Sequence, residues 1–328
     1  MVLELSLACQ SNDRTRALLD GRIAIEGCAV THVAGHAEEI FQRAFRHCEF
    51  DISELSFSTH LMTTARGEGP YIGIPAFVSR SFRHSAIYIR SDRGIDSPAG
   101  LKGRQIGVPD FQQTAGVWVR GMLAEEYGVH PGEIRWRSGG LEQAGRKPRM
   151  PLKLPPEISV EPIPESKTLA GMLAEGELDA VISPRAPSCF GPANSVVRLF
   201  PEFRKAEEHY FAKTGLFPIM HLIGIRRELA EKHPWLAMNV YKALAKSKAL
   251  AFEELKLVDT MRVAHPWLAE EIGRVQALMG ADYWRYGVKE NSREIGALVK
   301  YAAADGLISR EIGAEELFDP TTADELRF

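Results

Sequence analysis

The stretch Ser97-Pro-Ala-Gly-Leu-Lys-Gly-Arg-Gln-Ile-Gly-Val-Pro109 leads from a turn into a short apolar segment. Residues 104–108 of it fit a strand, residues 109–114 a turn, and residues 115–127 a helix. A strand that is followed directly by a helix is the repeating unit of folds with largely parallel sheets. The stretch therefore predicts an α/β fold.

The same alternation of strands and helices continues on both sides of this stretch. Strands are predicted over residues 3–8, 28–33, 50–57, 86–90, 133–137, 159–162, 178–183 and 219–225, and helices over residues 15–19, 37–47, 58–66 and 167–174. Residues 139–156 are rich in Gly, Pro, Lys and Arg and predict a long surface loop, and residues 227–318 look helical throughout.

Two strand–helix modules followed by a helical tail predict two lobes joined by two crossovers. Lobe one would comprise residues 1–95 and 216–328, with the helical C-terminal tail packed on it, and lobe two residues 96–215. Ligands of open α/β sheets bind beside the carboxyl ends of the strands. We therefore expect a ligand cleft between the lobes.

The composition is that of an ordinary globular protein. The chain has 328 residues, 45% of them hydrophobic, and 40 basic against 43 acidic residues give a net charge of −3. Such a balance provides no bulk field for nucleic acid, and no apolar stretch is long enough to span a bilayer. We expect neither nucleic acid nor a membrane as partner.

The cysteines and the N-terminus bear on the compartment. Cys9, Cys28, Cys48 and Cys189 are scattered without metal-binding spacing, which is typical of reduced thiols. The first residues already fit a strand and show no secretory signal pattern. These features predict a cytoplasmic protein.

Two motifs resemble a known fold. Residues 97–109 resemble the sequence that begins the second lobe of type II periplasmic-binding-protein folds, with Gly100 where that pattern usually has Asp. Leu178-Asp-Ala-Val-Ile-Ser183 resembles a later strand of the same fold. The resemblance implies the two-lobed architecture that the alternation predicts.

A set of short motifs resembles one family, that of 4,5-dihydroxyphthalate decarboxylases. In order along the chain they are Arg80-Ser-Phe-Arg-His84, Val117-Trp-Val-Arg-Gly121, Ser138-Gly-Gly-Leu-Glu142 with Gly145-Arg146, Ser183-Pro-Arg-Ala-Pro187, Thr214-Gly-Leu-Phe-Pro-Ile-Met-His221 and Leu317-Phe318. The resemblance implies a cytoplasmic carboxy-lyase that removes CO2 from a dihydroxylated aromatic carboxylic acid without an organic cofactor. Two alternatives stay open: a solute-binding protein for an aromatic acid in ABC-type transport, and another enzyme on this fold, such as a chorismate-dehydratase-like one.

The implied reaction requires groups that bind carboxylates. Of the 40 basic residues 27 are arginines, which reflects either base composition or binding of a small anion by their planar forks. Gln113 and Thr114 precede a predicted helix, whose free amides attract a carboxylate; the alternative is that one of them simply caps the helix. The other candidate ligands lie at strand ends or crossovers, and they are Arg14, Ser56, Arg80, Arg83, Ser183 and Arg185. For Arg80 and Arg83 we expect one to bind substrate and the other a structural carboxylate.

The reaction also requires a proton donor beside the ring. His84 and His221 lie near the two predicted crossovers, and histidine exchanges a proton near neutral pH; the alternative for each is a core residue. Glu54 ends a buried strand and would bind catechol hydroxyls, orient a histidine, or pair with an arginine. We expect no metal, with a divalent ion on these three residues as the alternative. Trp235, Trp267 and Trp284 are packing residues or mark a contact between copies in a homo-oligomer.

Overall fold

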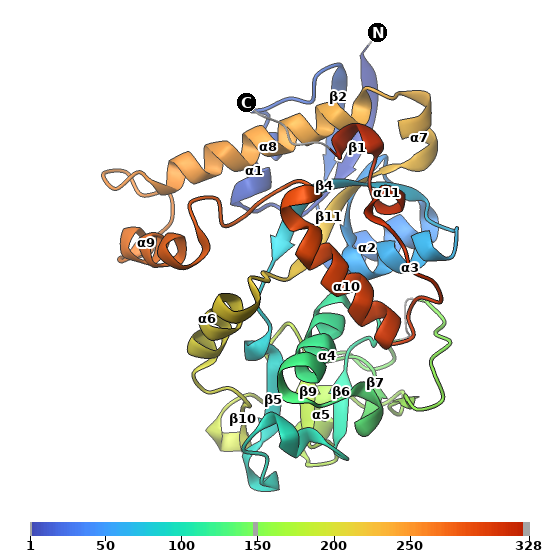
Figure 1. Cartoon of the computed structure of the whole chain (residues 1–328), viewed down its shortest axis with the longest axis vertical. Helices are drawn as coiled ribbons and strands as arrows, with labels where there is room; N and C mark the ends of the chain where they lie inside the picture. Colours follow the sequence, from blue (N-terminus) through green and yellow to red (C-terminus); the bar gives the residue numbers. More distant parts are fainter. Residues whose placement is uncertain (1, 147–149, 324–328) are drawn as a thin grey trace. The chain divides into compact units, whose positions relative to one another are not determined.

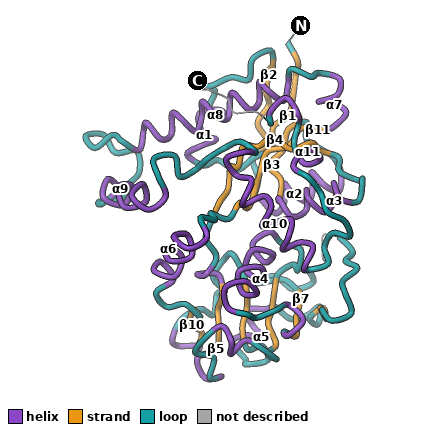
Figure 2. Tube along the Cα trace, viewed as in Figure 1, coloured by secondary structure: helices purple, strands orange, loops and turns teal. Residues whose placement is uncertain are grey.

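The computed structural model describes residues 2–146 and 150–323 of the chain, and these residues form two compact units. Unit 1 comprises residues 1–80, 219–295 and 312–328, and unit 2 residues 81–218 and 296–311, as far as they are described. Each unit has its own β-sheet with helices packed around it (Figures 1 and 2).

The sheet of unit 1 has the strand order β2-β1-β3-β11-β4. Strand β1 pairs in parallel with β2 and β3, whereas β11 runs antiparallel to both of its neighbours. The strands are β1 (Leu3–Ala8), β2 (Cys28–Val33), β3 (Ile52–Ser56), β4 (Tyr71–Arg80) and β11 (Ile219–Arg226). All five residues of β3 are buried, so this strand lies at the centre of the unit.

The helices of unit 1 bury their apolar sides on this sheet and on one another. The short helix α1 packs along the long helix α8, α8 also contacts β4, and α2 packs on β3. The helices are α1 (Asp13–Leu19), α2 (Ala37–His47), α3 (Phe57–Ala65), α7 (Arg227–Lys232), α8 (Leu236–Leu255), α9 (Leu268–Met279), α11 (Ala314–Leu317) and the first residues of α10 (Ser292–Ala304).

The sheet of unit 2 has the order β10-β5-β9-β6-β7-β8. Strands β6, β7, β8 and β9 are parallel, and β5 runs antiparallel to β9 and β10. The strands are β5 (Ile87–Arg90), β6 (Gln105–Val108), β7 (Arg135–Ser138), β8 (Val160–Pro162), β9 (Ala180–Ile182) and β10 (Val196–Arg198).

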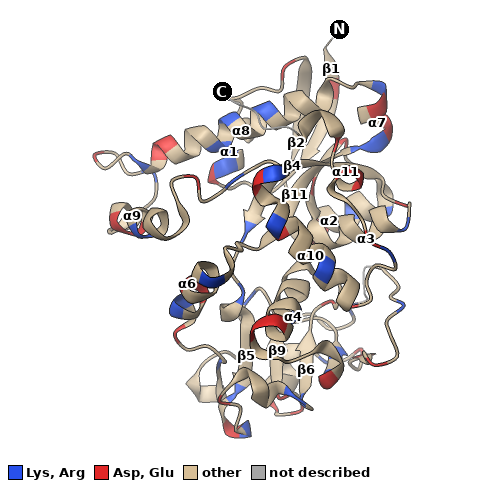
Figure 3. Cartoon of the chain, viewed as in Figure 1, with Lys and Arg blue, Asp and Glu red and all other residues tan. Residues whose placement is uncertain are grey.

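Helices α4 (Thr114–Tyr127), α5 (Leu169–Ala174), α6 (Phe203–Thr214) and the rest of α10 complete unit 2. The contact between β6 and α5 requires a glycine at Gly107, because a Cβ there would lie 2.8 Å from the Leu169 side chain. In both units, charged residues of both signs are spread over helices and loops (Figure 3).

The α/β class is confirmed, and β1, β2 and α2 have the predicted bounds. The expectation of largely parallel sheets is wrong, because β11 pairs antiparallel with β3 and β4, and β5 pairs antiparallel with β9 and β10, so both described sheets are mixed. Strand β4 was not predicted, because Pro75 interrupts it; proline is tolerated there since β4 is an edge strand. Strand β10 and helix α6 were also not predicted.

The division of the chain differs from the expected lobe boundaries. The first change of unit lies between residues 80 and 81 rather than at 95, because β5 pairs with β9 in the second sheet. Residues 296–311 of the predicted tail belong to unit 2, and residues 256–267 and 280–288 contain no helix. The predicted loop 139–156 contains no helix or strand where it is described, and its residues 147–149 lie outside the described part. None of the helices in the described ranges has the length and apolar character needed to cross a membrane.

Candidate functional site

A histidine–carboxylate pair lies at the centre of unit 1. In the sheet, His221 of β11 pairs with Ser56 of β3, and Ile223 pairs with Glu54, so that Glu54 is the diagonal neighbour of His221. The His221 Nδ1 atom lies 2.7 Å from Oε1 of Glu54. The pairing of β11 with β4 shifts its register on both sides of His221, and such bulges redirect a side chain.

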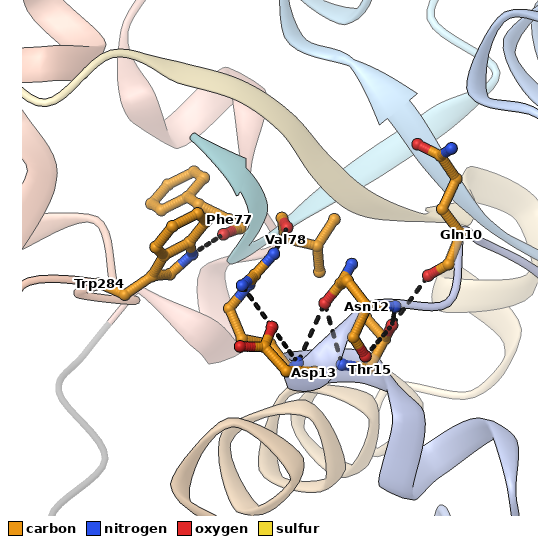
Figure 4. Close-up of polar contacts among 8 residues, drawn as sticks. Gln10, Asn12, Asp13, Thr15, Phe77, Val78 and Trp284 are labelled. Atoms are coloured by element: carbon orange, nitrogen blue, oxygen red, sulfur yellow. Dashed lines mark hydrogen bonds and ion pairs between the residues drawn. The ribbon is translucent and has the colours of Figure 1, made fainter. Parts of the chain in front are cut away.

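The loop after β1 holds the carboxylate of Glu54 in place. The side chain of Glu54 is 1% exposed, and its Oε2 accepts a hydrogen bond of 2.8 Å from the Gln10 amide. The carbonyl of Gln10 accepts a hydrogen bond of 2.8 Å from Thr15 Oγ1, and Asn12 caps α1 through its own side chain (Figure 4). The cap of α1 thus fixes the loop that orients Glu54.

His221 is the more accessible member of the pair. Its side chain is 19% exposed, and the ring of Phe41 packs edge-on against it at 4.8 Å between centroids. Within the described ranges Nε2 makes no hydrogen bond. A carboxylate on Nδ1 favours the tautomer with a proton on that atom and fixes the orientation of the ring. The pair can therefore present Nε2 as a proton donor or acceptor.

The negative charge of Glu54 also acts on a neighbouring thiol. Burial, and secondarily the Glu54 carboxylate, raise the pKa of Cys9 well above its usual value. Cys9 ends up 1% exposed and uncharged at neutral pH. The thiol therefore provides an apolar neighbour for the pair.

Arg14 lies in the same unit, held by contacts of its own. Its guanidinium pairs with Asp13, donates a hydrogen bond of 3.2 Å to the Val78 carbonyl and stacks on the Trp284 ring at 3.9 Å. The Trp284 indole is itself fixed by a hydrogen bond of 2.7 Å to the Phe77 carbonyl. Substrate binding by Arg14 stays a prediction, and these contacts give the side chain a structural role as well.

Of Arg80 and Arg83, we expected one to bind substrate and the other a structural carboxylate. Arg80 is paired with such a carboxylate, that of Glu294. Its side chain has no exposed surface, and it lies 3.3 Å from Glu294 and hydrogen-bonds Asn291. Burial lowers the pKa of Arg80 to about 10, against the opposing effect of Glu294. These contacts give Arg80 a structural role, and contact of Arg80 with substrate stays a prediction.

Ser56 lies opposite His221 and begins the turn into α3, where it accepts a hydrogen bond of 3.3 Å from Thr59 Oγ1. Its side chain is buried. Of the predicted site residues, unit 1 therefore brings Glu54, Ser56 and His221 together.

His84 lies in unit 2, in a turn of 3-10 helix rather than at the predicted strand start. The rings of Tyr127, Phe200 and Tyr210 pack around it at 5.1–6.3 Å between centroids. The ring nitrogens of His84 have no hydrogen-bond partner in the described part of the chain, and burial lowers its pKa to about 4. This environment is that of a neutral packing residue.

Arg83, beside His84, is half-buried, and burial lowers its pKa to about 10 while the Glu207 carboxylate opposes that change. Burial in turn raises the pKa of Glu207, which accepts a hydrogen bond of 3.2 Å from the Ser85 amide. The two charges therefore balance each other at the surface of unit 2.

Two predicted anion-binding elements lie at the carboxyl ends of the strands of unit 2. Gln113 is the N-cap of α4 but makes no side-chain cap bond, and Thr114 is the first helical residue. Ser183 follows β9, and its Oγ accepts a hydrogen bond of 3.2 Å from the Arg185 amide. Arg185 is exposed, with no ion pair to any described carboxylate. Ligand binding by these four residues stays a prediction.

Sequence reasoning did not find the supporting residues Gln10 and Phe41, and it named Trp284 only as a packing or contact residue. Gln10 acts through its backbone, and the two aromatic residues reach their partners only through folding, so no local signal marks these contacts. In the described residues no group of three or more His, Cys, Asp or Glu side chains is placed to hold a metal ion.

Comparison with known proteins identifies the fold. The chain aligns over 98% of its length with the periplasmic aliphatic sulphonate binding protein SsuA from Escherichia coli, at a TM-score of 0.55 and 12% identity, covering 99% of that chain. It aligns equally with the desulfurization enzyme DszB, at a TM-score of 0.53 and 12% identity, covering 97% of that chain. At this identity the likeness concerns the fold alone, which is that of type II periplasmic binding proteins.

Relatives that are similar in sequence show to which family the chain belongs. No protein-family model matches the chain. The chain is 44% identical over 326 residues to a 4,5-dihydroxyphthalate decarboxylase from Comamonas testosteroni, covering 99% of both proteins. It is 53% identical over 188 residues to another from Pseudomonas putida, covering 57% of this chain and 73% of that protein. The chain therefore belongs to the 4,5-dihydroxyphthalate decarboxylase family and is a carboxy-lyase.

Proposed function

We propose that this protein decarboxylates 4,5-dihydroxyphthalate, or a closely similar dihydroxylated aromatic acid, to 3,4-dihydroxybenzoate and CO2, with His221 as the proton donor. The observation that carries the proposal is the contact of 2.7 Å between His221 Nδ1 and the buried carboxylate of Glu54. Membership of the decarboxylase family supports the substrate class.

The reaction begins with protonation of the ring carbon that bears the carboxylate. Nε2 of the doubly protonated His221 gives its proton to this carbon, a C–H bond forms, and the positive charge spreads to the carbon that bears the para hydroxyl. The bond to the carboxylate then breaks, its electron pair returns to the ring, and CO2 leaves. Each turnover consumes one proton, which His221 regains from water.

Glu54 positions and stabilises the proton donor. Its carboxylate fixes the ring of His221 through Nδ1, so that Nε2 points away from the buried side of the pair. It also stabilises the positive charge that the imidazole carries before proton transfer. Because the electron-rich ring accepts the charge, the proposed mechanism needs neither an organic cofactor nor a metal.

We also propose that unit 2 has a carboxylate-binding element of its own, formed by the start of α4 and by Arg185. The first amides of the 14-residue helix α4 have no acceptor within the helix, and its dipole attracts negative charge. Arg185 offers a guanidinium that is exposed and without an ion pair among the described carboxylates. Replacing Arg185 by Gln should therefore raise KM more than it lowers kcat.

The proposed substrate is tested by turnover of the purified protein. We expect release of CO2 and formation of 3,4-dihydroxybenzoate from 4,5-dihydroxyphthalate. Phthalate, which lacks the hydroxyl that stabilises the cation, should bind without reacting. Binding of 4,5-dihydroxyphthalate without turnover would contradict the proposal and indicate a solute-binding protein instead.

A further inference from the structure

A hollow of about 580 Å³ opens at the amino ends of strands β6, β7 and β9 in unit 2. Residues 99–100 and 102–105 form one wall, and Arg93, Arg135, Gly176, Glu177 and Asp179 complete the lining. The candidate site residues of unit 2, Thr114 and Ser183, lie at the carboxyl ends of the same strands. The hollow is thus at the opposite edge of the sheet from those residues.

Positive charge is in excess in this hollow. Its lining has four basic side chains, Arg93, Lys102, Arg104 and Arg135, against two acidic ones, Glu177 and Asp179. Three segments that are distant in sequence bring the basic residues together. A wall of this composition suits a hydrophilic anion.

The carboxylates in and near the hollow already form ion pairs with other basic residues. Asp179 lies 3.7 Å from Arg104, and Lys102 lies 2.9 Å from Glu133. Glu177 is paired with Lys167, outside the hollow. None of these carboxylates neutralises the two remaining arginines.

Arg93 and Arg135 are held by backbone carbonyls alone. Arg93 Nη2 donates a hydrogen bond of 2.6 Å to the Gly176 carbonyl, and Arg135 Nε donates one of 3.1 Å to the Gly103 carbonyl. Within the described chain neither guanidinium is paired with a carboxylate; Asp92, which precedes Arg93, is paired with Arg90. One N–H group of each guanidinium therefore orients the side chain, and the other N–H groups can bind a ligand.

We propose that this hollow is a binding site for a phosphate-bearing small molecule, separate from the decarboxylase site. Two planar guanidinium groups that line one hollow match the oxygens of a phosphate or pyrophosphate group. Arg93 and Arg135 contact the ligand, and Arg104, which also lines the hollow, adds a third guanidinium. The inference does not depend on the proposed substrate, because none of these residues belongs to the site described above.

The test is calorimetric titration with inorganic pyrophosphate at low ionic strength. We expect one binding site per chain, whose affinity falls as salt is added, and at least a tenfold loss of affinity in the double variant R93Q/R135Q. The matched control R204Q/R274Q removes two exposed arginines elsewhere and should bind as the parent protein does. The single variant R135K, which keeps the charge but not the fork, should fall between the two.

Two further measurements distinguish a phosphate site from a general anion site and from the decarboxylase site. Phthalate, a dianion without phosphate, should not displace pyrophosphate, and R93Q/R135Q should keep the decarboxylase kcat/KM and thermal midpoint of the parent protein. Absence of pyrophosphate binding, equal affinity in R93Q/R135Q, or displacement by phthalate would each overturn the phosphate assignment. None of these results bears on whether the protein decarboxylates its substrate.

Discussion

Replacing Glu54 by Gln tests the role of the buried carboxylate beside His221. The substitution keeps the shape of the side chain, and the new amide oxygen can still accept the hydrogen bond from the Gln10 amide. It removes the negative charge that faces His221 Nδ1 at 2.7 Å. We expect kcat to fall while KM changes little, because the doubly protonated imidazole loses its partner.

The size of the loss follows from the burial of this contact. Glu54 is 1% exposed, so solvent screens its charge only weakly. A hydrogen bond to a charged group contributes about 1.5–3 kcal/mol, and each 1.36 kcal/mol of activation free energy changes a rate about tenfold. The E54Q variant should therefore show a kcat on the order of 10–150-fold below that of the parent protein.

The assay is steady-state formation of 3,4-dihydroxybenzoate from 4,5-dihydroxyphthalate. The matched control E208Q removes a carboxylate from the surface of α6, where Glu208 pairs with Arg204, and should leave kcat unchanged. Thermal unfolding of E54Q separates loss of catalysis from loss of structure. A folded E54Q enzyme with kcat within twofold of the parent value would refute the reasoning.

Three more outcomes are expected. Burial lowers the pKa of His84 to about 4 from an ordinary value near 6.5. Between these two pH values the unfolded chain therefore binds a proton that the folded chain does not. The unfolding free energy should fall by up to about 3 kcal/mol as the pH drops through this window. Urea unfolding at several pH values should show that the unfolding free energy depends less on pH in H84F than in the parent protein. An equal slope of free energy against pH in the two proteins would contradict this prediction. The R80M variant removes the closer partner of the buried Glu294 and leaves Arg285, at 3.6 Å, as the remaining one; calorimetry should show a lower thermal midpoint, with a loss below the about 3–5 kcal/mol of a fully unpaired buried charge, whereas R204M at the surface should not differ from the parent. Dialysis against EDTA should leave kcat unchanged, since the proposed mechanism uses no metal, and restoration of lost activity by a divalent ion would contradict that mechanism.

Sequence patterns predicted the elements that depend on local chemistry. Strands β1 and β2 and helix α2 lie where periodicity placed them, because their apolar residues follow the spacing of a strand or a helix. Strand β4 escaped prediction because Pro75 is normally a break in such a pattern. Its position at the sheet edge is a property of the assembled sheet and not of the local sequence.

The candidate site shows the same division between local and distant effects. Glu54 was expected to orient a histidine or to pair with an arginine, and the register of β3 against β11 places it on His221, 167 residues away. His84 looked equally suited to proton transfer. Only folding brings Tyr127, Phe200 and Tyr210 around it and buries it. Arg80 likewise finds Glu294 through a contact that spans 214 residues.

The central claim, that His221 delivers the proton to the ring, is tested most directly by the H221Q variant. We would measure its turnover of 4,5-dihydroxyphthalate and its dissociation constant for phthalate, which we expect to bind without reacting. Loss of a positioned general acid lowers a rate by about 10²–10⁴-fold. The account predicts a fall of that size in kcat with phthalate affinity unchanged. An H221Q enzyme that keeps kcat within tenfold of the parent value would contradict it.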